Sequence, residues 1–231
     1  MTVFDLSLIT SGPYHDMLLA GLKLSLQLLG VTLLLALTLA LVVAMMRLSG
    51  LRVLSAGAWL FVEAIRNVPL LAHMLFWYFG APELLPEAAR EWLYAHNYEA
   101  VAAVAALTFY TAAYMSEDVR SGLRAIPHGQ FEASRALGFG FLRGMRLIIL
   151  PQALRVTLPP LISQTLNLWK DTSIATVIGT AELMYQAAKV ETETFRSVEA
   201  FVFATTCYLT VSLLITGLAV TYQHFFPARA V

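Results

Sequence analysis

Several charged and amide side chains interrupt stretches of the chain that are otherwise apolar. A charge near the centre of a bilayer costs at least about 2.5 to 3.5 kcal/mol on insertion scales, so each one that is retained should be paired, buried or next to a cavity. Groups of this kind could bind a polar solute within a membrane. The candidate pathway residues are Glu63, Arg66, Asn67, Gln164, Asn167, Lys170 and Asp171.

The first group of these residues has two interpretations. Glu63 and Arg66 are three residues apart, so on a helix they share a side and can pair. Such a pair could line a pathway, or it could neutralise itself and only fix helix packing. Asn67 precedes Val68 and Pro69. Because proline lacks a backbone donor, the helix is expected to kink there, and broken helices commonly mark substrate sites in transporters.

The second group forms a polar stripe on one expected helix. Gln164, Asn167 and Asp171 follow each other at steps of three and four residues. Such a stripe can bind a polar solute or a neighbouring helix. If the helix restarts after Pro160, Lys170 lies about 15 Å further along and near mid-membrane, which the prolines favour. If the helix runs unbroken from residue 147, Lys170 instead reaches the outer interface.

A basic segment over residues 120–151 is expected to project from the membrane as two short helices joined by a turn. Pro127 can begin a helix that extends over residues 130–137. Gly138 and Gly140 then allow a sharp turn, with positive φ where it is needed, and Phe141 opens a second element. The residues alone also fit a simpler role, in which the segment is a basic connector that meets anionic lipid.

Composition places the chain in a bilayer and excludes several functions. Of 231 residues, 58% are hydrophobic and 13% are charged, about half the charged share of a soluble domain. The net charge is zero and no basic run suggests nucleic acid. The single cysteine, Cys207, and the isolated His73 predict neither a disulfide nor a metal site. Residues 1–16 contain no Lys or Arg, so no cleaved signal peptide is expected.

Apolar runs predict an all-α membrane protein with five transmembrane helices. The expected spans cover residues 24–46, 53–80, 100–116, 147–169 and 200–223. The fourth contains Pro151, Pro159 and Pro160, so a kinked or discontinuous element is expected rather than one straight helix. Residues 172–188 are too polar for a confident sixth span, and we expect a re-entrant or partly buried helix there.

The distribution of Lys and Arg predicts the orientation. One side of the expected topology holds eight of them: Arg47, Arg52, Arg120, Arg124, Arg135, Arg143, Arg146 and Arg229. The other side holds Arg90, Lys189 and Arg196 among many acidic residues. By the positive-inside rule, the N-terminus is expected outside and the C-terminus in the cytoplasm, which agrees with an odd number of spans.

One spaced pattern in the basic segment resembles a known family. Glu132, Ala133 and Ser134, followed by Gly138 and then by Ile148, Leu150 and Pro151, are similar to the EAA loop of type I ABC importer permeases. The resemblance implies that this loop is a coupling helix seated in a groove of the ATP-binding subunit, with the glutamate and glycine central to the contact. Ser134 stands where many relatives have a second alanine, which is a small-for-small change.

Two further segments resemble the polar amino acid branch of that family. They are residues 63–71 and residues 167–173, the latter followed by Ile178, Gly179, Glu182 and Leu183. Residues 66–70 with residues 82–87 are particularly similar to glutamate/aspartate permeases. An amino acid would need a partner for its carboxylate, which Arg66 or Lys170 could supply. It would also need a partner for its ammonium group, which Glu63 or Asp171 could supply.

The resemblance implies a multi-protein importer in the bacterial inner membrane. A second permease subunit, identical or paralogous, an ATP-binding subunit dimer and a periplasmic substrate-binding protein are expected partners. No phosphate-binding loop occurs in the chain, so ATP and Mg²⁺ are expected to be used by the partner, and this chain is expected to bind no cofactor. The expected units are a periplasmic extension (residues 1–16), a transmembrane domain (17–223) and a cytoplasmic tail (224–231).

Two other classes of protein are alternatives. An ion-coupled secondary transporter could use the charges of Glu63, Arg66, Lys170 and Asp171 as a relay. An intramembrane enzyme would need a paired carboxylate motif, a His-Glu-x-x-His motif or a Gly-x-Ser-x-Gly motif, and the sequence contains none of them.

Overall fold

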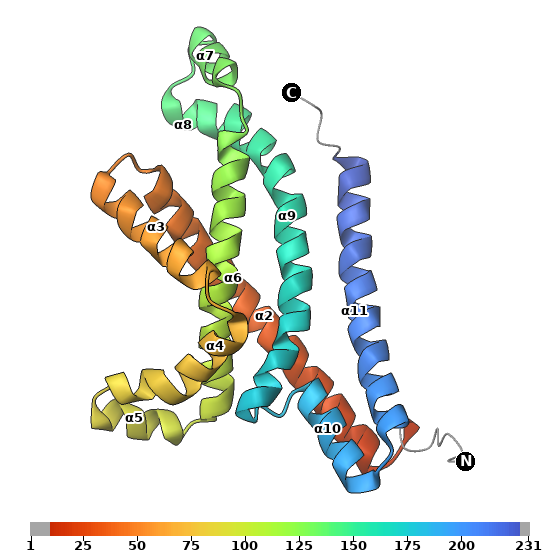
Figure 1. Cartoon of the computed structure of the whole chain (residues 1–231). Coiled ribbons are helices and arrows are strands. Elements are labelled where there is room, and N and C mark those ends of the chain that lie inside the picture. The colour runs from red at the N-terminus through yellow and green to blue at the C-terminus, as the bar shows by residue number, and fades with distance from the viewer. Residues whose placement is uncertain (1–9, 227–231) are drawn as a thin grey trace.

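The computed structural model describes residues 10–226, and every regular element in that part of the chain is helical (Figure 1). In chain order these elements are α2 (Pro13–Leu48), α3 (Arg52–Arg66), α4 (Leu70–Leu75), η1 (Phe76–Gly80), η2 (Ala81–Leu84), α5 (Glu87–Tyr94), α6 (Tyr98–Arg124), α7 (His128–Ala136), α8 (Phe141–Gly144), η3 (Met145–Ile149), α9 (Leu150–Asp171), η4 (Thr172–Ile178), α10 (Leu183–Thr194) and α11 (Ser197–Phe225). Most of the expected 1–16 extension and of the 224–231 tail lies outside the described residues.

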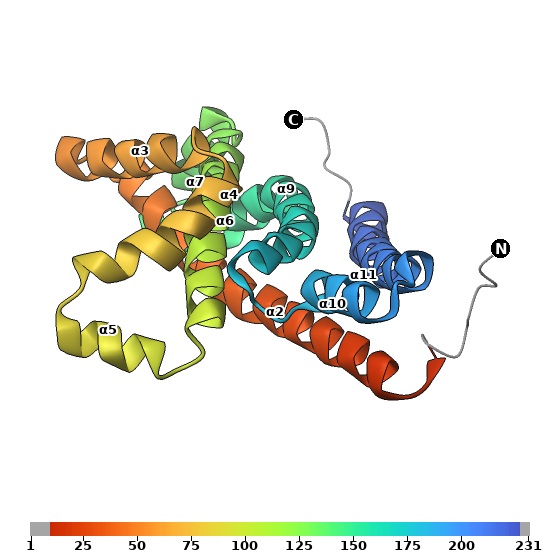
Figure 2. The same ribbon diagram turned by 60° about the horizontal axis from the view of Figure 1, so that its bottom comes forward.

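The centre of the fold is the packing of α2 against α6, its most extensive helix contact. Small side chains make this contact possible: Ala36 and Ala40 of α2 are fully buried with Ala112 of α6. Within a membrane, small residues let helix backbones approach closely and gain van der Waals contact. Figures 1 and 2 place α3, α4 and α5 on one side of α6, with α10 and α11 on the other.

The expected second span is a sharply broken pair of helices. Arg52–Arg66 and Leu70–Leu84 meet at 102°, and the break lies at residues 67–69, as the proline predicted. The side chain of His73 bridges the break, because its Nε2 lies 3.0 Å from the carbonyl oxygen of Ile65. The expectation of one element over residues 53–80 is therefore corrected to two.

The fourth span was expected to be kinked or discontinuous, and the structure contradicts the discontinuity. Pro159 and Pro160 lie inside α9, which continues through them to Asp171. Departures from α-helical geometry occur at its two ends, in the π-helical turn η3 and the 3₁₀ segment η4. Lys170 and Asp171 nevertheless lie beside Tyr110 and Thr111, near the middle of α6.

Three continuous helices in the described chain are long and apolar enough to cross a membrane, namely Pro13–Leu48, Phe141–Ile178 and Ser197–Phe225. The broken pair can count as a fourth. α6, which corresponds to the expected third span, is outside this set. The count of five spans is thus not confirmed.

Residues 172–188 fold as a compact, largely buried connection. η4 ends at Gly179, whose φ of +82° suits a residue without a Cβ. Glu182 then caps the N-terminus of α10 by accepting a hydrogen bond from the backbone N–H of Tyr185. The packed 3₁₀ segment and helix agree with the partly buried helix that was expected here.

Candidate functional site

The projecting segment between α6 and α9 has the expected helix–turn–helix form. Helix α7 begins directly after Pro127, and α8 begins at Phe141. Gly138 has a φ of +76°, while Gly140 has an ordinary φ of −67°. The left-handed conformation that the turn requires therefore falls on Gly138 alone. We call residues 120–151 the coupling loop, after the role that the family resemblance implies for them.

Ser134 packs α7 against α8. Its side chain is 5% exposed, and a Cβ added to Gly144 would overlap its Oγ. A small residue is consequently needed at both positions. Gln152 of α9 connects α9 to α7, because its Nε2 donates a hydrogen bond to Oε1 of Gln130 at 3.2 Å. The two helices thus form one supported unit.

The opposite face of α7 is exposed. Glu132 and Ala133 are exposed, and so are large apolar side chains at the same tip: Leu137 (68%), Phe141 (75%) and Leu142 (81%). Sequence analysis did not select these three apolar residues, although three exposed apolar side chains in a basic loop are a recognisable signal of a protein contact.

The remaining predicted coupling residues divide between packing and exposure. Ile148 is half-buried against a small core formed by Ile126, Ile149 and Ala153, whereas Leu150 and Pro151 are exposed. Ile149, which the sequence pattern did not select, is the buried residue that anchors the loop to α9.

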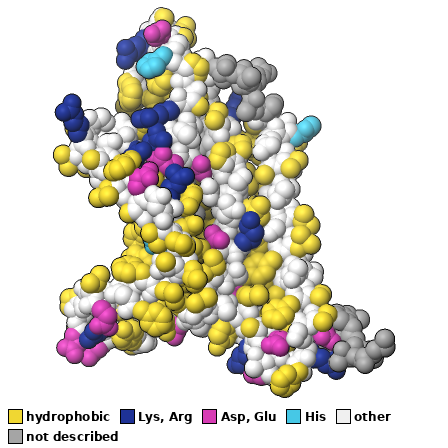
Figure 3. Space-filling model, viewed as in Figure 1, with side chains coloured by type: hydrophobic (Ala, Val, Ile, Leu, Met, Phe, Trp, Pro, Cys, Tyr) yellow, Lys and Arg dark blue, Asp and Glu magenta, His cyan; other side chains and the backbone are white. Residues whose placement is uncertain are grey.

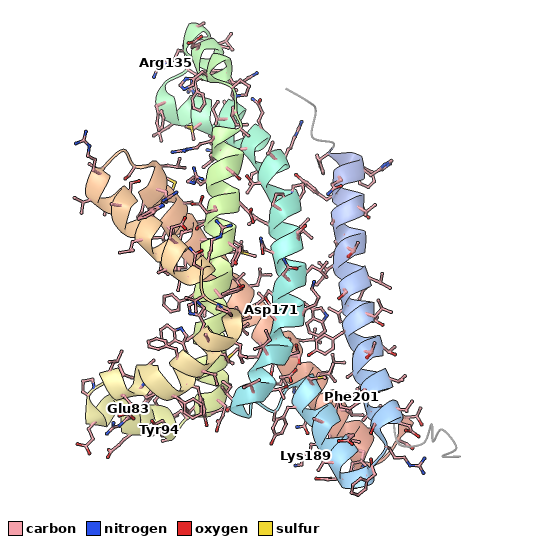
Figure 4. The ribbon with its side chains drawn as sticks, viewed as in Figure 1. Glu83, Tyr94, Arg135, Asp171, Lys189 and Phe201 are labelled. Carbon is pink, nitrogen blue, oxygen red and sulfur yellow. The ribbon has the colours of Figure 1, made fainter. Side chains whose placement is uncertain are left out.

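Four of the seven predicted pathway residues line one pocket between α6 and α9, with a volume of about 380 Å³. Its walls are Tyr110, Thr111 and Tyr114 from α6, and Gln164, Asn167, Leu168, Lys170 and Asp171 from α9. Figure 4 shows Asp171 at the end of α9, midway along the molecule. The volume is within the range of about 300 to 1,000 Å³ that is usual for small-molecule sites. We call this cavity the α6–α9 pocket.

The predicted Glu63–Arg66 pair does not form: no ion pair joins these residues in the described chain. The carboxylate of Glu63 instead accepts from Nδ2 of Asn67 at 3.1 Å. The guanidinium carbon of Arg66 lies 4.9 Å from the ring centroid of Tyr114, in cation–π geometry. A spacing of three residues does place Glu63 and Arg66 on the same side of the helix. Each side chain nevertheless contacts another residue instead.

Tyr114 connects the two groups of predicted residues. Its ring carries Arg66 on one side and lines the α6–α9 pocket, and its hydroxyl lies 3.5 Å from the hydroxyl of Tyr110. Sequence analysis missed both tyrosines. Two tyrosines spaced by four residues within an alanine-rich helix were the available signal, because that spacing stacks them on one face.

A second polar centre, formed around Glu182, joins four elements. Glu182 is fully buried and accepts hydrogen bonds from Ser25 Oγ at 3.1 Å, from Tyr208 Oη at 3.0 Å and from the hydroxyl of Thr176. Ser25 Oγ also accepts from the backbone N–H of Leu183 at 3.0 Å. The carboxylate therefore ties α2, η4, α10 and α11 together, and its role is structural.

Within residues 10–226 no group of three or more His, Cys, Asp or Glu side chains could hold a metal ion. The polar groups that line the α6–α9 pocket include a tyrosine pair, two amides, one cation and one carboxylate. Such a set can form hydrogen bonds and ion pairs with a polar, zwitterionic molecule.

Comparison with known proteins places this architecture in a family. The model of the binding-protein-dependent transport system inner membrane component family matches residues 36–225. Because the match covers most of the chain, the protein belongs to this family, and its all-helical structure is the type I ABC importer permease fold. The family resemblance seen in the coupling loop is confirmed.

Individual relatives belong to amino-acid ABC transporters. The chain is 35% identical over 212 residues to the probable glutamine ABC transporter permease protein GlnM of Bacillus subtilis (strain 168), covering 91% of this chain and 90% of the relative. It is 35% identical over 168 residues to the glutamate/aspartate import permease protein GltJ of Escherichia coli (strain K12), covering 71% and 68%.

Two solved structures agree with the fold. One, described as a crystal structure of an amino acid ABC transporter with histidines, superposes with a TM-score of 0.83 at 29% identity, covering 97% of this chain and 99% of that one. The methionine ABC transporter MetNI in an inward-facing conformation matches with a TM-score of 0.65 at 17% identity, over 92% and 99%, which supports the fold alone.

Proposed function

We propose that this chain is the permease subunit of an ATP-driven importer that moves a polar amino acid across the bacterial inner membrane by alternating access. The observation that carries the proposal is the coupling loop, in which the buried Ser134–Gly144 contact presents Glu132 outward on a rigid support. The chain itself performs no covalent chemistry in this proposal, and ATP with Mg²⁺ is used by a separate ATP-binding subunit.

The tip of the coupling loop suits a protein groove. Glu132 and Ala133 are exposed, and the same tip exposes Leu137 and Phe141 together with Arg135 and Arg143. A partner would therefore meet one acidic side chain among apolar and basic ones. Buried apolar anchors with a central polar contact are the usual anatomy of a protein interface. Residues Glu132, Ala133 and Gly138, with Ser134, Ile148, Leu150 and Pro151 in support, are therefore assigned to ATPase coupling.

The α6–α9 pocket is proposed to contact the transported amino acid. Lys170 or Arg66 would pair with an α-carboxylate, and Asp171 or Glu63 with an ammonium group. In the described chain, none of these four has an ion-pair partner within 4 Å. Lys170 and Asp171 line the pocket and can meet a zwitterion directly, with Gln164 and Asn167 as hydrogen-bonding neighbours. Arg66 would first have to leave the Tyr114 ring, and Glu63 would have to leave its hydrogen bond with Asn67.

Glutamate or aspartate is the first substrate to test. An acidic amino acid has two carboxylates, and two cations are near Tyr114: Arg66 lies over its ring, and Lys170 lines the same pocket. The names of related permeases include glutamine, octopine, glutamate/aspartate and arginine. The polar amino acid class is common to these names.

The orientation and partners follow the same proposal. Arg135 and Lys189, which the positive-inside count assigns to opposite sides, lie at opposite ends of the molecule (Figure 4). The α7 end would face the cytoplasm and an ATP-binding subunit dimer. The α5 and α10 end would face the periplasm, where a substrate-binding protein delivers solute. A second permease subunit, identical or paralogous, would complete the pathway.

Co-purification with the ATP-binding subunit tests the coupling role. Glu132→Lys reverses the charge at the exposed contact, and Gly138→Asp forces a side chain into the left-handed turn, at a cost of about 1 to 2 kcal/mol. Each is expected to lower ATPase retention at least about tenfold while membrane insertion stays normal. Glu87→Lys, the same change at the opposite end, should retain the ATPase. Normal assembly of both loop variants would contradict the assignment.

A further inference from the structure

A second pocket lies outside the machinery described so far, where α2 turns into α3 beside the end of α6. Its volume is about 640 Å³, and it is lined by Arg47, Leu48, Gly50, Arg52, Ser55, Ala56, Trp59 and Arg124. Three of the eight lining residues are arginines and none is acidic. Figure 3 shows Lys and Arg side chains gathered on the half of the molecule that carries α3, α7 and α8.

The sequence brings these residues together through one turn and one helix face. Gly50, with a φ of +71°, lets the chain reverse between α2 and α3, so that Arg47 and Arg52 lie on either side of the turn. Arg52, Ser55 and Trp59 are spaced by three and four residues, which puts them on a single face of α3. Arg124 is the last residue of α6 and completes the pocket.

The arginines have more positive charge than nearby acids can neutralise. Among the described residues, Glu117 is the one carboxylate that forms an ion pair with the arginines at this end of α2, α3 and α6. Arg120 binds both of its oxygens, and Arg47 Nε lies 3.4 Å from Oε1. Arg52 and Arg124 have no ion-pair partner in the described chain. Guanidinium groups stay protonated at any physiological pH, so this excess is permanent.

Large apolar side chains surround the charged pocket. Trp59 is 51% exposed, and Leu51, Val53 and Leu60 beside it are exposed by 61%, 84% and 63%. A permanent positive pocket next to exposed apolar side chains and a tryptophan matches the layering of a bilayer interface, where head groups meet acyl chains. A soluble anion would use the arginines but leave these apolar side chains in water.

We propose that this pocket binds the phosphate head group of an anionic phospholipid from the cytoplasmic leaflet, with the acyl chains along α3. Arginine recognises phosphate through paired N–H donors, and basic pockets between membrane helices on the cytoplasmic side are typical head-group sites. The inference rests on the proposed orientation. Since Arg124 lies three residues before Pro127, a bound lipid would also brace the start of the coupling loop.

Native mass spectrometry of the permease–ATPase complex tests the site. The probes are dioleoyl phosphatidylglycerol, dioleoyl phosphatidylethanolamine and inorganic phosphate. The wild-type complex is expected to retain the anionic lipid in preference to the zwitterionic one, and inorganic phosphate should not displace it. At about 1 kcal/mol for each basic residue, Arg52→Gln/Arg124→Gln should weaken retention about tenfold to thirtyfold. Arg155→Gln, an exposed arginine outside the pocket, should not weaken it.

Several outcomes would overturn the inference. Equal lipid retention in the double variant and in Arg155→Gln would do so, as would displacement by inorganic phosphate, which would indicate a soluble anion site. Loss of the ATPase from the double variant would make this surface a docking face for the partner protein. If the glutamine double variant cannot be isolated, the single variants Arg52→Gln and Arg124→Gln should each weaken retention about fivefold, and unchanged retention in both would also contradict the proposal.

The readout separates this inference from the proposed function. Lipid retention does not depend on transport. A failure of the coupling proposal would leave the Glu132→Lys complex with its ATPase, whatever lipid it holds.

Discussion

At the scale of single residues, Glu182 shows how a polar group can be buried in this protein without a counter-charge. Four donors from four elements surround its carboxylate: Ser25, Thr176, Tyr208 and the backbone N–H of Tyr185. A buried carboxylate is tolerated when hydrogen bonds replace those of water. The residue was part of a family pattern in the sequence, but nothing in that pattern showed that it joins distant helices.

Removing this carboxylate should destabilise the fold. Glu182→Ala leaves four buried donors unsatisfied, and each costs about 1 to 3 kcal/mol, with partial relaxation reducing the total to about 2 to 5 kcal/mol. Glu182→Gln keeps one acceptor and should lose less. Thermal unfolding of the detergent-solubilised protein measures both, with Glu193→Ala on the exposed side of α10 as the control. Equal melting of Glu182→Ala and Glu193→Ala would refute this role.

At the scale of elements, close helix crossings depend on glycines that face a neighbouring side chain. A Cβ added to Gly122 of α6 would overlap Oγ1 of Thr157 on α9, whereas Gly217 of α11 has nothing within 4 Å. Gly122 stands in a charged stretch between Arg120 and Arg124, and Gly217 stands in an apolar run, but neither context shows which of the two glycines faces a neighbouring side chain. The contact at Gly122 sets how closely α6 and α9 approach between the α6–α9 pocket and helices α7 and α8.

Gly122→Ala should therefore separate α6 from α9. The expected cost is about 1 to 3 kcal/mol, as for other overpacked cores. Gly217→Ala should be neutral or stabilising, since alanine favours helix by about 1 kcal/mol over glycine. Adding Thr157→Ala to Gly122→Ala removes the overlapping hydroxyl and should recover part of the loss. Thermal unfolding again provides the measurement, and a Gly122→Ala protein as stable as Gly217→Ala would show that the crossing is loose.

At the scale of the whole molecule, the coupling loop lies at one end (Figure 1). The α6–α9 pocket lies between the middle of α6 and the C-terminal end of α9. α6 and α9 both run from the pocket to the loop. Under the proposed function, a push on α7 and α8 would therefore be transmitted through these two helices to the pocket walls. This continuity is the physical basis expected for alternating access.

Charge removal in the pocket should impair transport but not assembly. In proteoliposomes that contain the permease, its ATPase and the binding protein, Lys170→Gln and Arg66→Gln should each reduce uptake of labelled glutamate about tenfold or more. The reason is that a charge-assisted hydrogen bond contributes about 1.5 to 3 kcal/mol. Lys189→Gln, an exposed lysine away from the pocket, is the matched control. Unchanged uptake in both pocket variants would return these residues to a packing role. Uptake that persists without ATP but requires a proton gradient would instead favour an ion-coupled mechanism.

The sequence by itself determined the properties that depend on short-range chemistry. Membrane insertion followed from composition, the break at residues 67–69 from proline, and the turn at Gly138 from backbone freedom. The spaced EAA pattern was sufficient to recognise the family. Each of these depends on residues close together in the chain, where composition and spacing decide the outcome.

Only the tertiary structure decided which distant side chains meet. It separated Glu63 from Arg66, carried α9 unbroken through Pro159 and Pro160, and brought Tyr114 between Arg66 and the pocket. A side chain can contact residues near it in the sequence or residues far from it. Which contact forms depends on how the helices cross. That choice is set by small residues such as Gly122, whose effect appears only when its neighbour on α9 is in place.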